Sequence, residues 1–189
     1  MANKVKYGFE QVYYAKATET IDAQTGTISY TYATPKRLLG GVSISLEQTG
    51  EISNFYADDQ VFFSTSSNGG YSGDLELAKI SDDFRTDILG ETQDQNDALV
   101  EFSDAQGSPF ALLFKFLGDG EGRLHCLYYC KATRPSIESQ TTEDSVEVGT
   151  ETLEITATPR LSDKAVKLTI DGSNTHASTF FNAVLEPNV

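Results

Sequence analysis

The sequence predicts an all-β protein, a β-sandwich or a partly rolled β-barrel with one short α-helix at about residues 82–89. Several segments alternate apolar and polar residues, which is the period of a strand with one buried face. Every aromatic residue is Phe or Tyr, with no Trp, a composition suited to pleated sheets. Helical periodicity is scarce outside the stretch from Ser81 to Leu89. With 189 residues, the chain is long enough to bury a core, and we expect a single domain over 1–189.

The chain is organised around residues 39–90. Val42 to Glu47 alternates apolar with small or acidic residues, so we predict a half-buried strand there. Further strands are predicted at 61–65 and 73–78, separated by Asn68-Gly69-Gly70, which can supply the positive φ angles of a tight turn.

The predicted helix begins and ends with recognisable capping residues. Ser81 is a good N-cap, and Asp82 and Asp83 lie where the helix dipole favours anions. Gly90 can close the C-terminus. Phe84 and Ile88 share one face at i,i+4, so we expect this helix to cover the sheet with an apolar stripe.

The remaining strands follow the same patterns. They are predicted at residues 8–15, 28–32, 98–102, 110–117, 123–132, 152–158 and 166–170. The segment 110–117 is apolar on both faces, so we expect it to be buried on both sides. The polar segment 136–150 is an expected flexible connection. The segment 173–189 is an expected C-terminal arm, apolar enough to pack on its own domain or on a neighbour.

The net charge of −14 is concentrated in the middle of the chain. Residues 41–110 carry two Lys/Arg against fourteen Asp/Glu, whereas residues 1–40 carry five against three. One interpretation is a solvated acidic surface, and the other is an acidic wall that a polyanion passes without sticking. Either way, the charge argues against ordinary nucleic-acid binding. The basic start beside an acidic middle suggests complementary faces on neighbouring copies, with scattered surface charge as the alternative.

The two cysteines predict no disulfide. In a strand, Cys126 and Cys130 would share a face about 13 Å apart, which is too far for a bond. We expect both to be reduced core residues, as in cytoplasmic folding. No apolar run is long enough to span a membrane, and MANKVKYGF is not a secretory signal.

No segment predicts catalysis, a cofactor or a metal site. The segment 118–122 lacks the following helix of a phosphate loop and favours a hairpin turn. The acidic pairs lack the calcium-loop pattern. His125 and His176 have too few neighbouring ligands for zinc, and Ser173 lacks a nucleophile elbow. We therefore expect that the protein is not an enzyme.

Five segments in order carry a resemblance to a known family: GGVSISL, FYADD, GYSGDLELAKISDDFRTDILG, FALLFKFLGDGEGR and YYCKATRPS. Over roughly residues 3 to 160, the chain resembles the major tail protein family of long, non-contractile-tailed phages of Gram-positive bacteria. The resemblance implies a structural virion protein, a tail tube subunit that self-assembles into hexameric rings. The rings stack into a tube that conducts DNA during ejection, without specific binding. The implied partners are copies of itself, the tape measure protein, and tail terminator and tip proteins. The implied location is the host cytoplasm during assembly and the virion tail afterwards.

Two sets of residues are candidates for these roles. In such proteins a loop between inner strands contacts the adjacent ring, which implies that role for the loop 47–60. Its candidate residues are Glu47, Glu51, Asn54, Phe55, Tyr56, Asp58 and Asp59. Exposed aromatics suit an interface, although Phe55 and Tyr56 could instead fold back onto their own core. The candidate lumen face consists of Ser43, Ser45, Glu47, Asp74 and Glu76.

Three other functions compete with this hypothesis. A β-sandwich adhesion module would predict a secretion signal and disulfides. A ligand- or sugar-binding sandwich would favour exposed aromatics, often Trp, around a concave face. An acidic DNA mimic that inhibits a DNA-binding enzyme would need carboxylates spaced like phosphates, and would form no tubes.

Overall fold

The computed structural model describes residues 3–4, 7–120, 122–137 and 149–188. The described chain is built mostly of antiparallel strands, so the predicted all-β, sandwich-like fold is confirmed, without closure into a barrel. The strands are β1 (Asn3–Lys4), β2 (Phe9–Ile21), β3 (Ile28–Tyr32), β4 (Lys36–Leu38), β5 (Gly41–Thr49), β6 (Ile52–Ala57), β7 (Gln60–Ser66), β8 (Gly70–Leu77), β9 (Thr92–Gln93), β10 (Leu99–Val100), β11 (Phe110–Phe116), β12 (Asp119–Gly120), β13 (Arg123–Ala132), β14 (Glu151–Ala157) and β15 (Lys167–Ile170). The expected flexible connection at 136–150 falls largely on residues outside this description.

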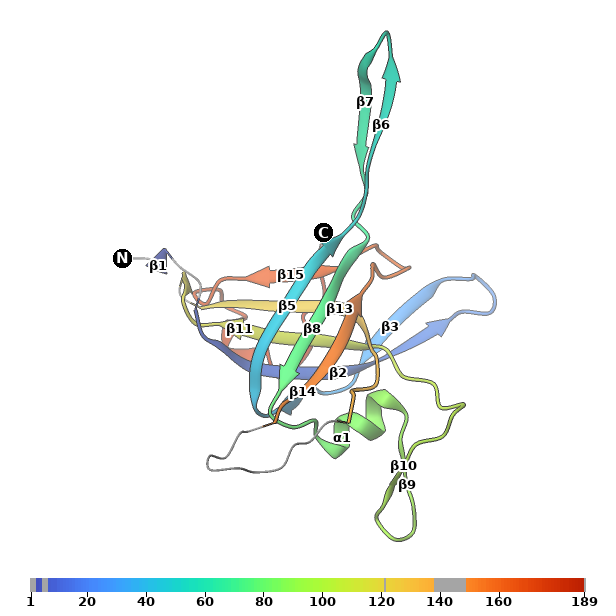
Figure 1. Ribbon diagram of the computed structural model, residues 1–189, viewed down its shortest axis with the longest axis vertical. Helices are drawn as coiled ribbons and strands as arrows, with labels where there is room; N and C mark the ends of the chain where they lie inside the picture. Colours follow the sequence, from blue (N-terminus) through green and yellow to red (C-terminus); the bar gives the residue numbers. More distant parts are fainter. Residues whose placement is uncertain (1–2, 5–6, 121, 138–148, 189) are drawn as a thin grey trace.

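One large sheet contains most strands, in the order β3-β2-β11-β13-β14-β8-β5. It branches at β13, whose first half pairs with β15 and whose last residues pair with β14. Because of this branch, β14, β8 and β5 leave the plane of the other strands and cross in front of β2, β11 and β13 (Figure 1). The result is a two-layered sandwich made from a single bent sheet.

The main core lies between these two layers. Its largest buried side chains include Phe84, Phe110, Leu75 and Leu112, all fully inaccessible to solvent. Phe84 contacts Phe110 edge to face, with ring centroids 5.5 Å apart. The short helix closes the end of the core, as its apolar stripe predicted.

A second core covers the opposite face of β11 and β13. Ala111 and Leu113 point into it, while Phe110 and Leu112 point into the main core, so β11 is buried on both sides as predicted. The C-terminal segment packs here on its own sheet. Phe180 is buried, and the hydroxyl of Tyr128 donates to the carbonyl of Leu185 at 2.8 Å.

The prediction that Cys126 and Cys130 share a face is wrong. Both are buried free thiols, but Cys126 lies in the second core and Cys130 in the main core. The cause is a β-bulge, because the pairing of β13 with β11 gains one residue between Leu127 and Cys130. One extra residue turns the side chains that follow it toward the opposite face of the sheet.

The helix is where the sequence predicts it, with a different geometry in its second half. Only α1 (Asp82–Phe84) is α-helical, and Arg85–Leu89 forms a π-helical turn that ends at Gly90 with φ of 80°. In this wider turn the neighbouring residues Ile88 and Leu89 are both buried. The Ser81 hydroxyl accepts a hydrogen bond from the Phe84 backbone N–H at 3.3 Å, as expected of an N-cap.

We expect Ser81→Ala to lower the free energy of unfolding by about 1 kcal/mol, the usual value of an N-cap. The loss arises because the N–H of a fully buried residue, Phe84, would lose its side-chain acceptor. Urea denaturation measures it, with Ser53→Ala in exposed β6 as the control. Equal losses in both variants would contradict a capping role.

Candidate functional site

A polar face covers the outer side of β5, β8 and β14. The two ladders place Ser45 opposite Asp74 and Asp74 opposite Glu154, so three strands contribute to the same row. We call this surface the polar face. It consists of Ser43, Ser45, Glu47, Ser72, Asp74, Glu76, Thr152, Glu154 and Thr156. The inward residues of the same strands, such as Leu75 and Ile155, are fully buried. The structure therefore brings together all five residues predicted from the alternation.

Hydrogen bonds hold the carboxylate of Glu76 in its charged form. Its two oxygens accept from Thr150 Oγ1 at 2.7 Å and from Ser43 Oγ at 2.8 Å. These two bonds, with the one from Thr150 the stronger influence, lower the pKa of Glu76 from its usual value. Glu76 therefore keeps its negative charge to a lower pH than a glutamate without these hydrogen bonds.

The polar face carries like charges in direct opposition. Asp74 and Glu154 are cross-strand partners, an arrangement that usually destabilises a sheet. Among the described residues, neither forms an ion pair, and the nearest cation in the register is Lys131, opposite Thr156 at the border. The face is hydroxyl-rich and negatively charged, which repels other polyanions.

A long hairpin projects from the end of this face. Strands β6 and β7 pair only with each other and extend away from the body of the protein (Figure 1). We call residues 50–69 the arm. Its turn is formed by Asp58 and Asp59, with φ of 52° and 60°, the two left-handed residues of a tight hairpin turn.

The predicted loop at 47–60 is therefore wrong in its conformation. Glu47 lies in β5 on the polar face, and Glu51 lies where the arm begins. Asn54, Phe55 and Tyr56 lie in β6. The reason is strand pairing, because Ile52 to Ala57 finds a complete antiparallel partner in β7.

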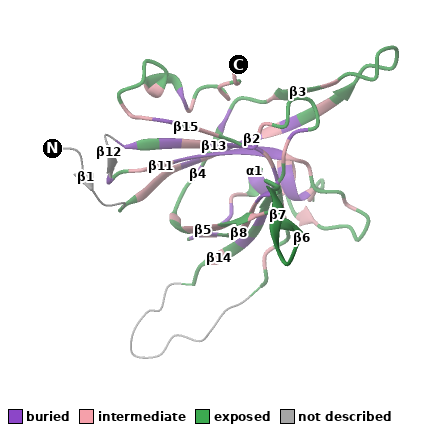
Figure 2. Cartoon of the chain, turned by 90° about the horizontal axis from the view of Figure 1, so that it is seen from above, coloured by how far each residue is buried: buried purple, intermediate pink, exposed green. Residues whose placement is uncertain are grey.

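The arm exposes large apolar side chains on a scale found nowhere else in the described chain. Figure 2 shows both of its strands as exposed, and no residue of either strand is buried. Phe62 is 71% exposed and Tyr56 is 64% exposed. The full set is Ile52, Phe55, Tyr56, Val61, Phe62 and Phe63. Phe55 and Tyr56 do not fold back onto their own core, so this alternative is excluded.

The base of the arm is tightly built. The backbone N–H of Gly69 donates to the Thr49 carbonyl at 2.7 Å, and that of Ser67 donates to the Glu51 carbonyl at 3.0 Å. A Cβ added to Gly50 would lie 2.2 Å from the Ser67 carbonyl oxygen. Only glycine fits there, so the two strands can continue from the body into the arm without a gap.

Sequence reasoning missed part of both surfaces. The arm also presents Val61, Phe62 and Phe63, for which the sequence predicts a strand but not an exposed surface. The polar face also contains Ser72 of β8 and the β14 residues Thr152, Glu154 and Thr156. The alternation of the β14 residues is visible in the sequence, but only the register with β8 places them beside Asp74 and Glu76.

In the described ranges, no group of three or more His, Cys, Asp or Glu side chains could hold a metal ion. Among the same residues, no helix is long and apolar enough to cross a bilayer.

No protein-family model matches the sequence, and no curated protein matches it significantly.

Proposed function

We propose that this chain is a tail tube subunit of a phage with a long, non-contractile tail. Copies associate side by side into rings, the rings stack through the arm, and DNA passes along the polar face. The observation that carries the proposal is the arm: an exposed apolar hairpin at the end of a strand pair whose outer face is hydroxyl-rich and acidic. Assembly, rather than a chemical reaction, is the activity of such a molecule.

The arm supports assembly because its apolar side chains are unfavourably exposed to water in a single chain. Contiguous apolar patches on soluble proteins usually mark interaction sites. A two-stranded hairpin without other contacts is at best marginally stable in water. A partner that covers the six apolar residues would gain hydrophobic stabilisation and would order the hairpin at once.

The open edge of the sheet supports side-by-side association. Strand β5 is the last strand of the sheet, so one of its edges has no partner strand among the described residues. Pairing of this edge with a neighbouring copy would satisfy its backbone groups and continue the sheet across subunits. The polar face belongs to β5 and its neighbours β8 and β14, so a ring built in this way repeats the face in every copy.

The polar face suits a channel for DNA. Its carboxylates repel phosphates, and its Ser and Thr side chains are small and uncharged. A surface of this kind lets a polyanion slide without a tight contact. We expect six copies in each ring, the tape measure protein in the lumen during growth, and terminator and tip proteins at the ends.

Negative-stain electron microscopy of the concentrated, purified chain tests this function, with light scattering alongside. We expect rings or hollow tubes, either unaided or after addition of the tape measure protein. A chain that stays monomeric in both conditions would contradict the proposal. It would then favour a monomeric binding module or an acidic DNA mimic.

A further inference from the structure

A cleft lies at the end of the β5–β8 ladder farthest from the arm. It has a volume of about 460 Å³ and is formed between the segments 37–40 and 78–82. The backbone N–H of Ala78 donates to the Gly40 carbonyl at 2.7 Å, so the cleft begins where the ladder ends. We call it the basic cleft.

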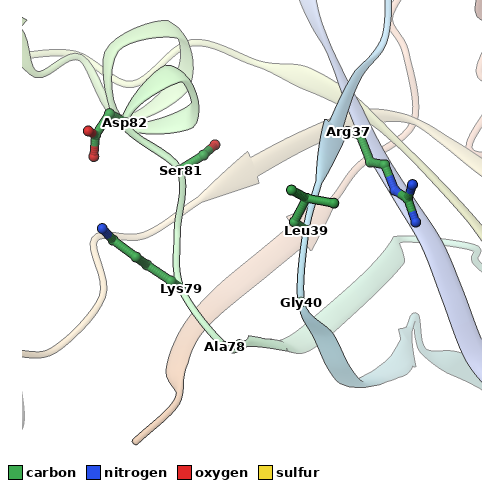
Figure 3. Close-up of a pocket in the computed structure, with 7 residues that line it drawn as sticks. All are labelled: Arg37, Leu39, Gly40, Ala78, Lys79, Ser81 and Asp82. Carbon is green, nitrogen blue, oxygen red and sulfur yellow. The ribbon is translucent and has the colours of Figure 1, made fainter.

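The basic cleft combines an apolar floor with unpaired positive charge. Leu39 is 68% exposed there, and Figure 3 shows it between Arg37 on one side and Lys79 on the other. Neither cation forms an ion pair with any described residue. Asp82 also lines the cleft, which leaves two positive charges against one negative charge.

The arm has the opposite chemistry. Its tip carries Asp58 and Asp59 beside exposed apolar residues such as Tyr56 and Phe62. The chain has no Lys or Arg between Arg37 and Lys79, and the fold brings these two flanking cations into one cleft. The acidic tip of the arm and the basic cleft are therefore complementary in charge, and each also offers an apolar surface.

Geometry excludes contact between the two within one copy. The ladder runs from the pair Gly41–Leu77 at the cleft to the pair Thr49–Gly70 at the arm. At about 3.4 Å per residue this is a separation of roughly 27 Å, and the arm extends away from it. A contact between complementary sites at opposite ends of a molecule repeats head to tail, and it builds an open stack wherever its rotation does not close a ring.

We propose that the basic cleft receives the tip of the arm from a second copy of this chain. This inference rests on the proposed function and adds the receiving site on the next ring. Arg37 and Lys79 pair with the carboxylates of Asp58 and Asp59, and Leu39 packs against the apolar residues behind the turn. The contact stacks copies along the direction of β5 and β8.

Disulfide trapping with the double variant Gln60→Cys/Ala78→Cys tests this site. Both positions are exposed, and both substitutions leave the four charges of the contact in place. Cys126 and Cys130 are buried and do not compete. Under mild oxidation we expect a ladder of cross-linked oligomers that forms about tenfold faster than in the control Gln60→Cys/Gln24→Cys, whose second thiol lies in the β2–β3 loop.

Charge reversal gives a second measurement. Adding Arg37→Glu and Lys79→Glu to the trapping variant is expected to slow cross-linking by about tenfold, because the acidic tip then meets an acidic cleft. Circular dichroism checks that the fold persists. Rings or tubes that form while the trapping variant reacts no faster than its control would overturn the receiving site and leave the proposed function intact. The absence of both assembly and cross-links would overturn both.

Discussion

A chain in which Phe55, Phe62 and Phe63 are replaced by Ser is expected to remain folded and to fail in the proposed assembly. The three Phe side chains are between 60% and 71% exposed and belong to neither buried cluster. Their removal therefore leaves the folded core unchanged. We expect the free energy of unfolding to change by less than about 0.5 kcal/mol, as for other surface substitutions.

The effect on assembly should be much larger. Truncating an aromatic hot-spot residue at the centre of an interface costs about 2 kcal/mol or more of binding free energy. The loss of even one such residue raises the concentration needed for assembly by about thirtyfold. Light scattering over a concentration series, with electron microscopy of the products, measures this shift.

The matched control replaces three exposed apolar residues outside the arm, namely Ile21, Ile137 and Leu161, with Ser. It removes comparable apolar surface from other places, and we expect assembly close to that of the wild type. If the arm variant assembles at the wild-type concentration, the arm is not the stacking element. If it unfolds in dilute solution, the aromatics stabilise the monomer instead.

The polar face was predictable from the sequence because its strands are buried on one side and exposed on the other. Burial of Leu75 and Leu77 against the core forces the outward positions to be polar, so Asp74 and Glu76 alternate with them. The short helix was located by a different local rule, since Ser81 accepts a backbone N–H at its start and Gly90 adopts the left-handed conformation at its end. Local rules determine these features, and local rules are visible in a single sequence.

Only half of the arm was predictable: the strand expected at 61–65 corresponds to β7, whereas the segment that forms β6 was expected to be a loop, because the arm has no buried side. Hydrophobic alternation arises only when one face of a strand is dry, and both faces of β6 and β7 are exposed in the single chain. The sequence therefore predicts a loop over 47–60, with Phe55 and Tyr56 between polar residues such as Asn54. Pairing with β7, rather than burial, makes this segment a strand.

The basic cleft depends on tertiary structure alone. Arg37 and Lys79 are separated by the whole β5–β8 hairpin, and no local pattern connects them. They meet because the hairpin returns the chain to its starting edge. The prediction that Cys126 and Cys130 share a face failed for a related reason. A β-bulge inserts one extra residue between them, and no periodicity in the sequence reveals it.

Gly70→Ala is expected to be the most destabilising small substitution at the base of the arm. Gly70 is buried at the start of β8 with φ of 106°, a conformation that residues with a Cβ rarely adopt. A Cβ built there would lie 1.9 Å from the carbonyl oxygen of Ala157 in β14. Neither the clash nor the strain can be relieved by a side-chain movement, because the opposing atom belongs to the backbone.

We expect the free energy of unfolding to fall by about 3 kcal/mol, combining backbone strain with displacement of β8 from β14. Gly149→Ala is the matched control, since nothing lies within 4 Å of its Cβ, and it should change stability by less than about 0.5 kcal/mol. Urea denaturation of both variants measures the difference. Because β8 leads directly from the arm into the polar face, a displaced Gly70 would also change the direction of the arm, so assembly should fail even where the variant remains folded. Equal stability of the two variants would show that β8 can move away from β14 at little cost. The inference that Gly70 fixes the direction of the arm relative to the body would then be wrong.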